Sequence, residues 1–199
     1  FANRYHTDYY MDKFNLYIDK IDLNFWRELC TKEGKLRSYK KGEYFLHRGE
    51  TTKCVWGFIK HGYFKYSVID SEGNIHITGF SFCDTPIGDY SSLVMNTPVA
   101  ADIIAAKDSE VYVCNRNIVD ELFEKEPKLH SAISDGFFIQ AYDSFLNMYR
   151  LSAKEHYIHL LRCCPDILQN ITLKELASYL QITPTYLSRI RKEITFGEK

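Results

Sequence analysis

The sequence predicts an α+β protein with a strand-rich N-terminal half, a long central helix and two short helices near the C-terminus. Three observations predict this class. Short apolar runs broken by glycine occupy residues 35–115, helical periodicity with two apolar stripes follows residue 126, and two closely spaced amphipathic patterns follow residue 170. The composition, 45% apolar and 26% charged with a net charge of −1, is that of a globular chain without the basic excess of a nucleic-acid coat protein.

The strands of the N-terminal half are predicted from short apolar runs that alternate with turns. Gly42, Gly49, Gly62 and Gly73 mark those turns, and an aromatic content of 15% also favours strands. Strands of about five residues at this spacing indicate an antiparallel sandwich or barrel. The runs are Tyr44–Leu46, Val55–Ile59, Tyr63–Val68, Ile75–Phe80, Val99–Ala106 and Glu110–Cys114.

The six cysteines do not have the spacing of a structural zinc site. Cys54, Cys83 and Cys114 lie in apolar runs, so we expect them to be buried free thiols. The adjacent pair Cys163-Cys164 leaves a redox switch as an alternative, although vicinal disulfides are strained and the cytosol is reducing. No apolar run reaches the ~20 residues of a membrane span and no signal-peptide core is seen, so we expect a cytoplasmic protein.

Residues 127–150 are predicted to form one long helix with two apolar stripes. A helix with two apolar faces must bury both. We expect one face to pack on the strand-rich domain and the other to form a homodimer seam, with full burial inside one subunit as the alternative. The residues assigned to the seam are Ile133, Phe137, Ala141 and Met148, and the second stripe holds Phe138, Tyr142, Phe145 and Tyr149.

A further helix is predicted to begin after Ser152. Ser152 and Glu155 have the spacing of a capping box, in which each side chain satisfies a free backbone amide at the start of a helix. We expect this helix to run to about Cys163 and to end at Pro165. Leu151, just before it, is the expected hinge to the C-terminal module.

The last thirty residues have the pattern of a helix-turn-helix. Thr172 and Glu175 form a second capping box, while Thr183 with Pro184 gives a hydroxyl N-cap followed by proline at the first helical position. Gln181 lies in the turn between them, at a position that is often glycine because it needs a left-handed backbone. We therefore expect about 1 kcal/mol of strain at Gln181.

Two short helices joined by so tight a turn place the second one in the major groove of DNA. Arg189 is the best candidate for a base contact, because a guanidinium can bind guanine O6 and N7 together. Arg191 and Lys192 are expected to bind the phosphate backbone. The alternative is a helical subdomain with a solvated basic face. The candidate DNA-binding residues are Thr183, Thr185, Tyr186, Ser188, Arg189, Arg191 and Lys192.

In this order, these parts resemble the Crp/Fnr family of bacterial transcription regulators over nearly the whole chain. Lys40–Glu50 resembles the first β-roll hairpin of the family, Ile59–Tyr66 the following strand-turn-strand, and Pro86–Val94 the phosphate-binding cassette. Thr183–Glu193 is similar to the recognition helix, with Arg189 on its characteristic arginine. The resemblance implies a double-stranded β-helix (jelly-roll) sensor domain, a dimerisation helix and a winged-helix-like module. Because the sequence ends soon after the recognition helix, we expect no wing.

The resemblance places an effector pocket at the cassette, but the residues that would hold a cyclic phosphate differ. cAMP-binding members use an Arg-Ser pair after the cassette, whereas residues 97–101 contain neither at the matching positions. No Lys or Arg lies between Gly88 and Ile103, and Asp89 and Asp102 would repel an anion. We therefore predict that cAMP and cGMP do not bind, which leaves another small molecule or a vestigial pocket. The candidate pocket residues are Gly88, Asp89, Tyr90, Ser91, Ser92, Val99 and Ala100.

Other sensing chemistries and catalysis lack the residues that they require. Iron–sulfur members need an N-terminal cysteine cluster, and only Cys30 lies in that region. Haem sensing would have to rest on the single histidines His61 and His76. No nucleophile–base pattern, metalloprotease motif or phosphate-binding loop is found, so we expect no enzyme, no catalytic residue, no metal and no cofactor.

The sequence thus predicts a homodimeric, sequence-specific DNA-binding transcription regulator. Double-stranded DNA, a second copy, RNA polymerase and an unidentified small-molecule effector are the candidate partners, and no membrane is expected. The alternative is a small-molecule or protein sensor whose helical tail docks a protein. We expect an N-terminal extension at residues 1–13, a sensor domain at 14–126, a dimerisation helix at 127–150 and a DNA-binding domain at 151–199.

Overall fold

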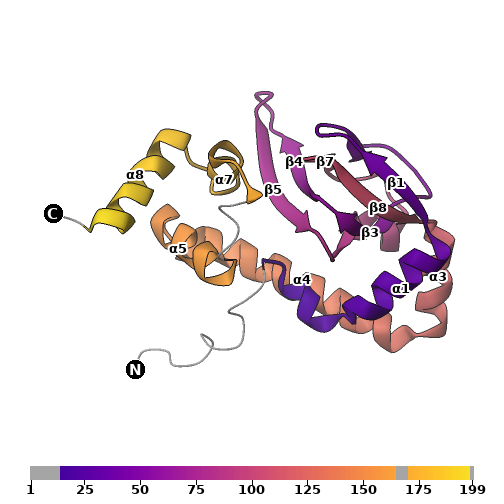
Figure 1. Ribbon diagram of the computed structural model, residues 1–199. Helices are drawn as coiled ribbons and strands as arrows, with labels where there is room; N and C mark the ends of the chain where they lie inside the picture. The colour runs from indigo at the N-terminus through magenta and orange to yellow at the C-terminus, as the bar shows by residue number, and fades with distance from the viewer. Residues whose placement is uncertain (1–13, 165–169, 198–199) are drawn as a thin grey trace, which may run out of the picture. The chain divides into compact units, whose positions relative to one another are not determined.

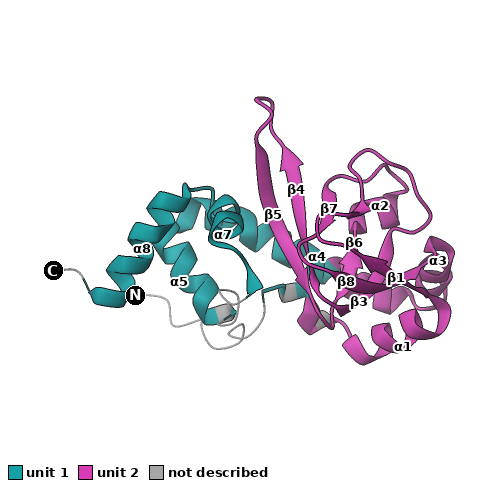
Figure 2. Ribbon diagram, turned by 45° about the horizontal axis from the view of Figure 1, so that its top comes forward, with its two compact units in different colours: residues 1–17, 135–199 teal, residues 18–134 magenta. Residues whose placement is uncertain are grey.

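A computed structural model of the protein describes residues 14–164 and 170–197 (Figure 1). The expected N-terminal extension and Pro165 lie outside these residues. The chain divides into two compact units, a β-roll unit of residues Ile18–Ser134 and a helical unit of residues Phe1–Tyr17 with Asp135–Lys199 (Figure 2). The long helix α4 (Pro127–Arg150) contributes to both units.

Two antiparallel four-stranded sheets form the β-roll unit, with strand orders β1-β8-β3-β6 and β2-β7-β4-β5. Large side chains that are almost fully buried, among them Trp26, Phe58, Phe64 and Phe80, fill its core. The predicted antiparallel, α+β architecture is therefore confirmed. The strands are β1 (Lys35–Tyr39), β2 (Tyr44–Leu46), β3 (Trp56–His61), β4 (Tyr63–Ile69), β5 (Ile75–Phe82), β6 (Pro86–Gly88), β7 (Asp102–Ala105) and β8 (Ser109–Cys114).

Strands β1 and β6 have no counterpart among the predicted apolar runs. Four of the five β1 residues are exposed, so the strand has no continuous apolar face and exists because it pairs with β8. β6 is three residues long and is defined by its pairing with β3 from Trp56 to Phe58. Both are edge strands, but β1 is mostly exposed whereas Pro86 and Ile87 of β6 are buried.

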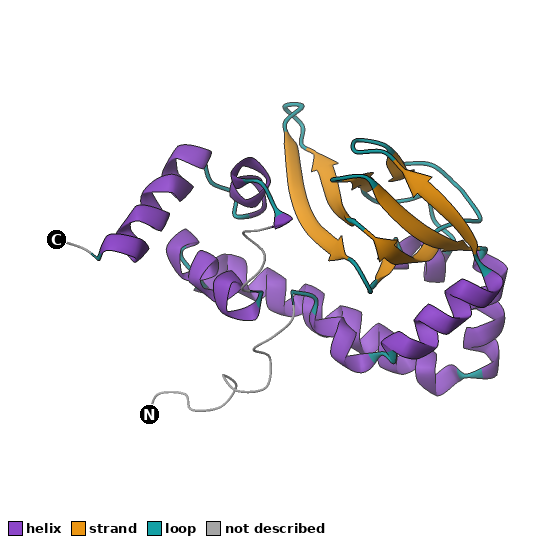
Figure 3. Cartoon of the chain, viewed as in Figure 1, coloured by secondary structure: helices purple, strands orange, loops and turns teal. Residues whose placement is uncertain are grey.

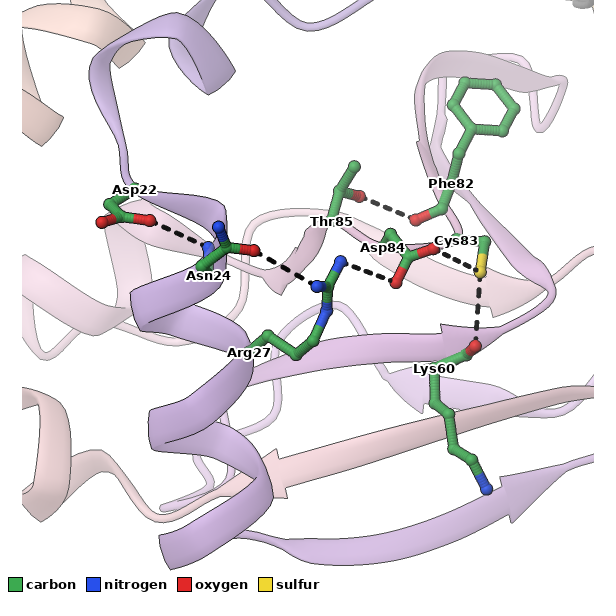
Figure 4. A network of polar contacts seen from close by, with 8 residues as sticks. All are labelled: Asp22, Asn24, Arg27, Lys60, Phe82, Cys83, Asp84 and Thr85. Carbon is green, nitrogen blue, oxygen red and sulfur yellow. Dashed lines mark hydrogen bonds and ion pairs between the residues drawn. The ribbon is translucent and has the colours of Figure 1, made fainter.

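Short helices complete this unit. They are η1 (Leu16–Lys20), which bridges the two units, α1 (Leu23–Glu33), α2 (Tyr90–Met95) and α3 (Arg116–Lys125). Asp22 is the N-cap of α1, and its carboxylate accepts hydrogen bonds from the amides of Asn24 and Phe25. The guanidinium of Arg27 lies 3.1 Å from the Asp84 carboxylate and ties α1 to the turn before β6 (Figure 4). Because both side chains are exposed, this ion pair stabilises the fold by at most about 1 kcal/mol.

The cysteines differ in part from expectation. Cys114 is buried as predicted, and Cys30 is buried too. Cys54 is only half-buried. The prediction for Cys83 was wrong, because β5 ends one residue earlier and Cys83 lies exposed in the turn, where its thiol donates to the Lys60 carbonyl (Figure 4). The side chain of Cys163 lies outside the described part of the chain.

The helical unit contains α5 (Ala153–Cys163), α7 (Leu173–Tyr179) and α8 (Pro184–Phe196), drawn as purple ribbons in Figure 3. The capping signals are confirmed: Ser152 and Glu155 form a reciprocal box, and so do Thr172 and Glu175. The side chain of Thr183 accepts from the Tyr186 amide, with Pro184 at the first helical position. Buried side chains at the α7–α8 contact are Leu176, Ala177, Leu180, Leu187 and Ile190.

Candidate nucleic-acid helix and effector cassette

The turn before α8 fixes the angle at which that helix is presented. Two hydrogen bonds close it, from the Ile182 amide to the Ala177 carbonyl (3.0 Å) and from the Gln181 amide to the Ser178 carbonyl (3.1 Å). Gln181 itself is left-handed, with φ of 56°, as the sequence pattern predicts. The turn thus has the hydrogen bonds of a Schellman motif without the glycine that usually accompanies it.

The two faces of α8 differ sharply in character. Leu187 and Ile190 are buried against α7, and helix geometry places Thr185, Ser188, Arg189 and Lys192 on the opposite side. Of the seven candidate DNA-binding residues, all but the half-buried Ser188 are exposed. The predicted set is therefore brought together on one helix and its cap: Thr183, Thr185, Tyr186, Ser188, Arg189, Arg191 and Lys192.

Arg189 lies at the centre of this exposed face, and its side chain is 69% exposed. Its guanidinium lies 4.8 Å from the centre of the Tyr186 ring and 3.7 Å from the Glu193 carboxylate. Glu193 is shared with Lys154 of α5, whose ammonium group is 3.4 Å away. Exposed pairs of this kind hold a side chain weakly, so an incoming phosphate or base can replace Glu193 as the partner of Arg189.

In the cassette, Gly88 and Asp89 link β6 to α2. A side chain at Gly88 would collide with the Val55 carbonyl and the Trp56 ring, so glycine is required at this position. Asp89 is 9% exposed and caps α2, accepting from the Ser92 amide at 3.0 Å and the Ser91 hydroxyl at 2.6 Å. Its second oxygen accepts from the Ala100 amide at 2.6 Å.

The other cassette residues make bonds within the β-roll unit. The Tyr90 hydroxyl lies 2.7 Å from that of Ser134, and the Ser92 hydroxyl donates to the Thr97 carbonyl at 2.7 Å. Val99 is buried. Three of the predicted pocket residues, Ser91, Ser92 and Ala100, therefore donate to the carboxylate of a fourth, Asp89. Tyr90 pairs with Ser134 instead, while the Gly88 carbonyl accepts from the hydroxyl of Tyr66 at 3.3 Å.

Arg116 is a cassette residue that the sequence pattern does not reveal. From the start of α3 its guanidinium donates to the Leu93 carbonyl and to the Asn96 side chain, and so binds the C-terminal end of α2. A third contact, 3.3 Å long, joins it to Asp120. This position lies more than ten residues beyond the cassette, so no local motif signals it.

The described residues contain no cluster of three potential metal ligands. Likewise, none of the helices within residues 14–164 and 170–197 is long and apolar enough to cross a membrane.

Comparison with known proteins identifies the fold. Residues 36–126 match the family model of the cyclic nucleotide-binding domain. No curated protein is significantly similar to the sequence. Among solved structures, FixK2 from Bradyrhizobium japonicum is 18% identical with a TM-score of 0.68, and the match covers 82% of this chain and 85% of FixK2.

Two further structures have the same architecture. The global regulator CLP of Xanthomonas campestris, described as responsive to c-di-GMP, is 12% identical with a TM-score of 0.65 over 87% of this chain and 92% of CLP. The catabolite activator protein of Thermus thermophilus is 16% identical with a TM-score of 0.54 over 86% of this chain and 83% of that protein. At these identities the likeness establishes the fold. Residues 36–126 therefore match the cyclic nucleotide-binding domain family, and the chain has the fold of the Crp/Fnr-type regulators.

Proposed function

We propose that the protein is a sequence-specific DNA-binding transcription regulator of the Crp/Fnr type. The observation that carries this proposal is the exposed polar and basic face of α8, which is held by a helix-turn-helix in a chain with this fold. The Thermus and Xanthomonas proteins support it, since their names describe an activator and a regulator of gene expression.

In this proposal α8 enters the major groove with its N-terminal half against the bases. Arg189 binds guanine, and Tyr186 below it holds the guanidinium plane in place. Thr185 and Ser188 read neighbouring bases or hold a phosphate, while Arg191 and Lys192 bind phosphates. Thr183 keeps the helix start in register by capping it.

A homodimer would present two copies of α8 to successive major grooves, and α4 is the proposed seam. Two of the residues assigned to it pack closely within the chain. Ile133 is fully buried, and Phe137 stacks on Tyr17 with ring centres 4.2 Å apart. Ala141 and Met148 are exposed. We therefore place the centre of the seam on the second stripe, with Ala141 and Met148 beside it: Phe138, Tyr142, Phe145 and Tyr149.

We further propose that cyclic nucleotides do not control the protein. The carboxylate of Asp89 already takes the hydrogen bonds of the Ser92 and Ala100 amides, and a second anion beside it would be repelled without a cation to compensate. Calorimetric titration of the full chain with cAMP and cGMP should give no saturable heat at micromolar concentrations. A stoichiometric signal with either nucleotide would contradict this proposal.

The experiment that tests DNA binding is selection from a randomised duplex pool, followed by anisotropy titration of the selected site over a range of salt concentrations. Binding should weaken steeply with salt because counterions are released from the DNA. Arg189→Ala should reduce affinity for the selected site by about tenfold or more, as expected for a lost guanine contact. Arg48→Ala, an exposed arginine of the β-roll unit, is the matched control.

The same experiment separates the main alternative, a sensor whose helical tail docks a protein. That alternative predicts no enriched duplex and no difference between Arg189→Ala and Arg48→Ala. Binding to a palindromic site that is lost in Arg189→Ala and retained in Arg48→Ala would support the proposal of a transcription regulator. It would also show that no added effector is needed.

A further inference from the structure

An open groove of about 650 Å³ lies on the β-roll unit where β1 turns into β2. None of the cassette residues lines it, so it is separate from the effector site that the sequence predicts. Its floor and walls come from β1, the following turn and the segment through β2. The lining residues are Arg37, Ser38, Tyr39, Gly42, Glu43, Tyr44 and His47.

The turn that forms the rim is held by hydrogen bonds from its backbone amides. The Gly42 amide donates to the Ala105 carbonyl at 2.8 Å, and the Lys41 amide donates to the Asp108 carboxylate at 3.0 Å. The Glu43 carboxylate accepts from the Lys40 amide at 2.7 Å. A groove whose rim is fixed in this way loses little conformational freedom when a ligand enters.

Aromatic rings supply flat surfaces in the groove. The Tyr44 ring stacks on the His47 ring, with centres 3.8 Å apart and planes 17° apart, and Tyr44 remains 42% exposed. Tyr39 is wedged edge-on against Phe45 and Phe64, with centres 5.8 and 5.7 Å away. The wall is thus a stacked pair of rings beside a third ring that packs against two others, which suits a planar ligand.

Arg37 supplies an exposed positive charge. No carboxylate of the described residues forms an ion pair with it, whereas the carboxylate in the groove, Glu43, is engaged by the Lys40 amide. Burial raises the pKa of Tyr39, and the adjacent Arg37 guanidinium opposes that rise, which places the charge beside the aromatic wall. Lys35 lies two residues earlier on the same face of β1 and adds to the positive potential.

We propose that this groove is a ligand site for a small planar aromatic anion, whose ring lies against Tyr44 and whose negative group pairs with Arg37. The site combines a guanidinium, which binds carboxylates in two parallel hydrogen bonds, with a stacking surface in the same groove. Both parts belong to the continuous segment of the β-roll unit that runs from β1 through the turn to β2. The proposal does not depend on DNA binding by α8.

The test is calorimetric titration of the full chain with 2-naphthoate, with 2-naphthamide as the uncharged analogue and cyclohexanecarboxylate as the non-aromatic one. Saturable binding of 2-naphthoate is expected, with both analogues weaker. Arg37→Gln should weaken 2-naphthoate binding about tenfold, the effect of losing a charge-assisted hydrogen bond. Tyr44→Leu should weaken it about fivefold. Arg48→Gln removes the same charge outside the lining residues and should change the affinity less than twofold.

All three substitutions are at exposed positions, so the variants are expected to fold. Amide chemical shifts recorded with 2-naphthoate should move at residues 37–47 and not at the cassette. The absence of saturable binding up to about 10 mM would overturn the proposal. So would equal affinities of Arg37→Gln and the wild type, or shifts confined to the cassette.

Discussion

Gln181 carries the strain of the turn on which the placement of α8 depends. Its backbone is left-handed, a conformation that costs an ordinary L-residue about 1–2 kcal/mol, while both hydrogen bonds of the turn are formed. Gln181→Gly removes the strain but adds freedom to the unfolded chain. The variant should therefore be more stable by about 0.5–1 kcal/mol, measured as a shift in the urea midpoint.

A series at this position gives the control. Asparagine tolerates left-handed backbone and valine does not, so stability should fall in the order glycine, asparagine, glutamine, valine. Gln181→Val more stable than Gln181→Gly would show that the turn relaxes to another conformation. The Gln181 side chain is exposed and makes a weak contact of 3.9 Å with the Met148 sulfur. All three substitutions remove that contact, so the order among glycine, asparagine and valine tests the backbone.

Asp89 is the residue whose removal should disturb the cassette most. Asp89→Ala leaves the Ala100 amide without its acceptor in a partly buried site and removes the cap of α2. The expected cost is about 2–3 kcal/mol, the sum of an unsatisfied amide and a lost cap. Hydrogen exchange at Ser92 and Ala100 should become faster in the same variant.

Asp22→Ala is the matched control for Asp89→Ala. Asp22 also caps a helix through two amides, but it is exposed, so water can replace the lost acceptor. Its substitution should cost about 1 kcal/mol. Equal costs for the two variants would mean that the Asp89 carboxylate is not holding the cassette together.

At the scale of elements, the sequence predicts those parts whose cause is local. Capping boxes at Ser152 and Thr172 set the starts of α5 and α7, and the apolar stripe of α8 fixes which of its side chains reach solvent. Strands with a continuous apolar run are found for the same reason. β1 and β6 are not, because their cause is pairing with β8 and β3, which lie far away in the sequence.

In the candidate sites, too, features with a local cause could be predicted and features that depend on distant contacts could not. The exposed face of α8 follows from helical periodicity alone, so the exposure of its candidate residues could be predicted, apart from the half-buried Ser188. The sequence placed Asp89 in the cassette but could not reveal its bond to Ala100, eleven residues away. The contacts of Arg116 with α2 depend likewise on how α3 packs. The groove at Arg37 could not be predicted, because cavities arise from tertiary packing.

The helical unit should be sensitive to mild acid through His156 of α5. Burial lowers the pKa of His156 below its ordinary value of 6.5, and neighbouring His159 acts in the same direction. The folded state therefore resists protonation while the unfolded state does not. The resulting stability is present above pH 6.5 and is lost as the pH falls toward the lower pKa of the folded state.

Urea unfolding followed by circular dichroism between pH 7.5 and about pH 5 measures this loss. The midpoint of the wild type should fall with pH, and His156→Gln should show a smaller fall because it has no proton to bind. His159→Gln should give an intermediate slope, since it removes only one cause of the shift. An unchanged slope in His156→Gln would assign the pH dependence to other groups.

At the scale of the whole molecule, the exposed apolar surface of α4 is the feature that favours a dimer over a monomer. Phe138 is 68% exposed and Tyr149 is 78% exposed, and helical spacing places Tyr142 and Phe145 on the same stripe. Ring pairs order this stripe, with Phe138 stacked on Tyr142 at 5.9 Å. A continuous aromatic stripe on one helix is what a symmetric partner helix covers.

Tyr142→Glu places a charge at the centre of that stripe and should convert the dimer to a monomer, as measured by sedimentation velocity. Burying an uncompensated carboxylate in an apolar interface costs several kcal/mol, which favours the separated subunits. Ser71→Glu adds the same charge at an exposed turn of the β-roll unit, outside α4, and should leave the dimer intact. The monomer should also bind a palindromic site more weakly, because each α8 then binds alone. A dimer that survives Tyr142→Glu would place the seam elsewhere, whereas a monomer with unchanged DNA affinity would keep the seam and remove its role in DNA binding.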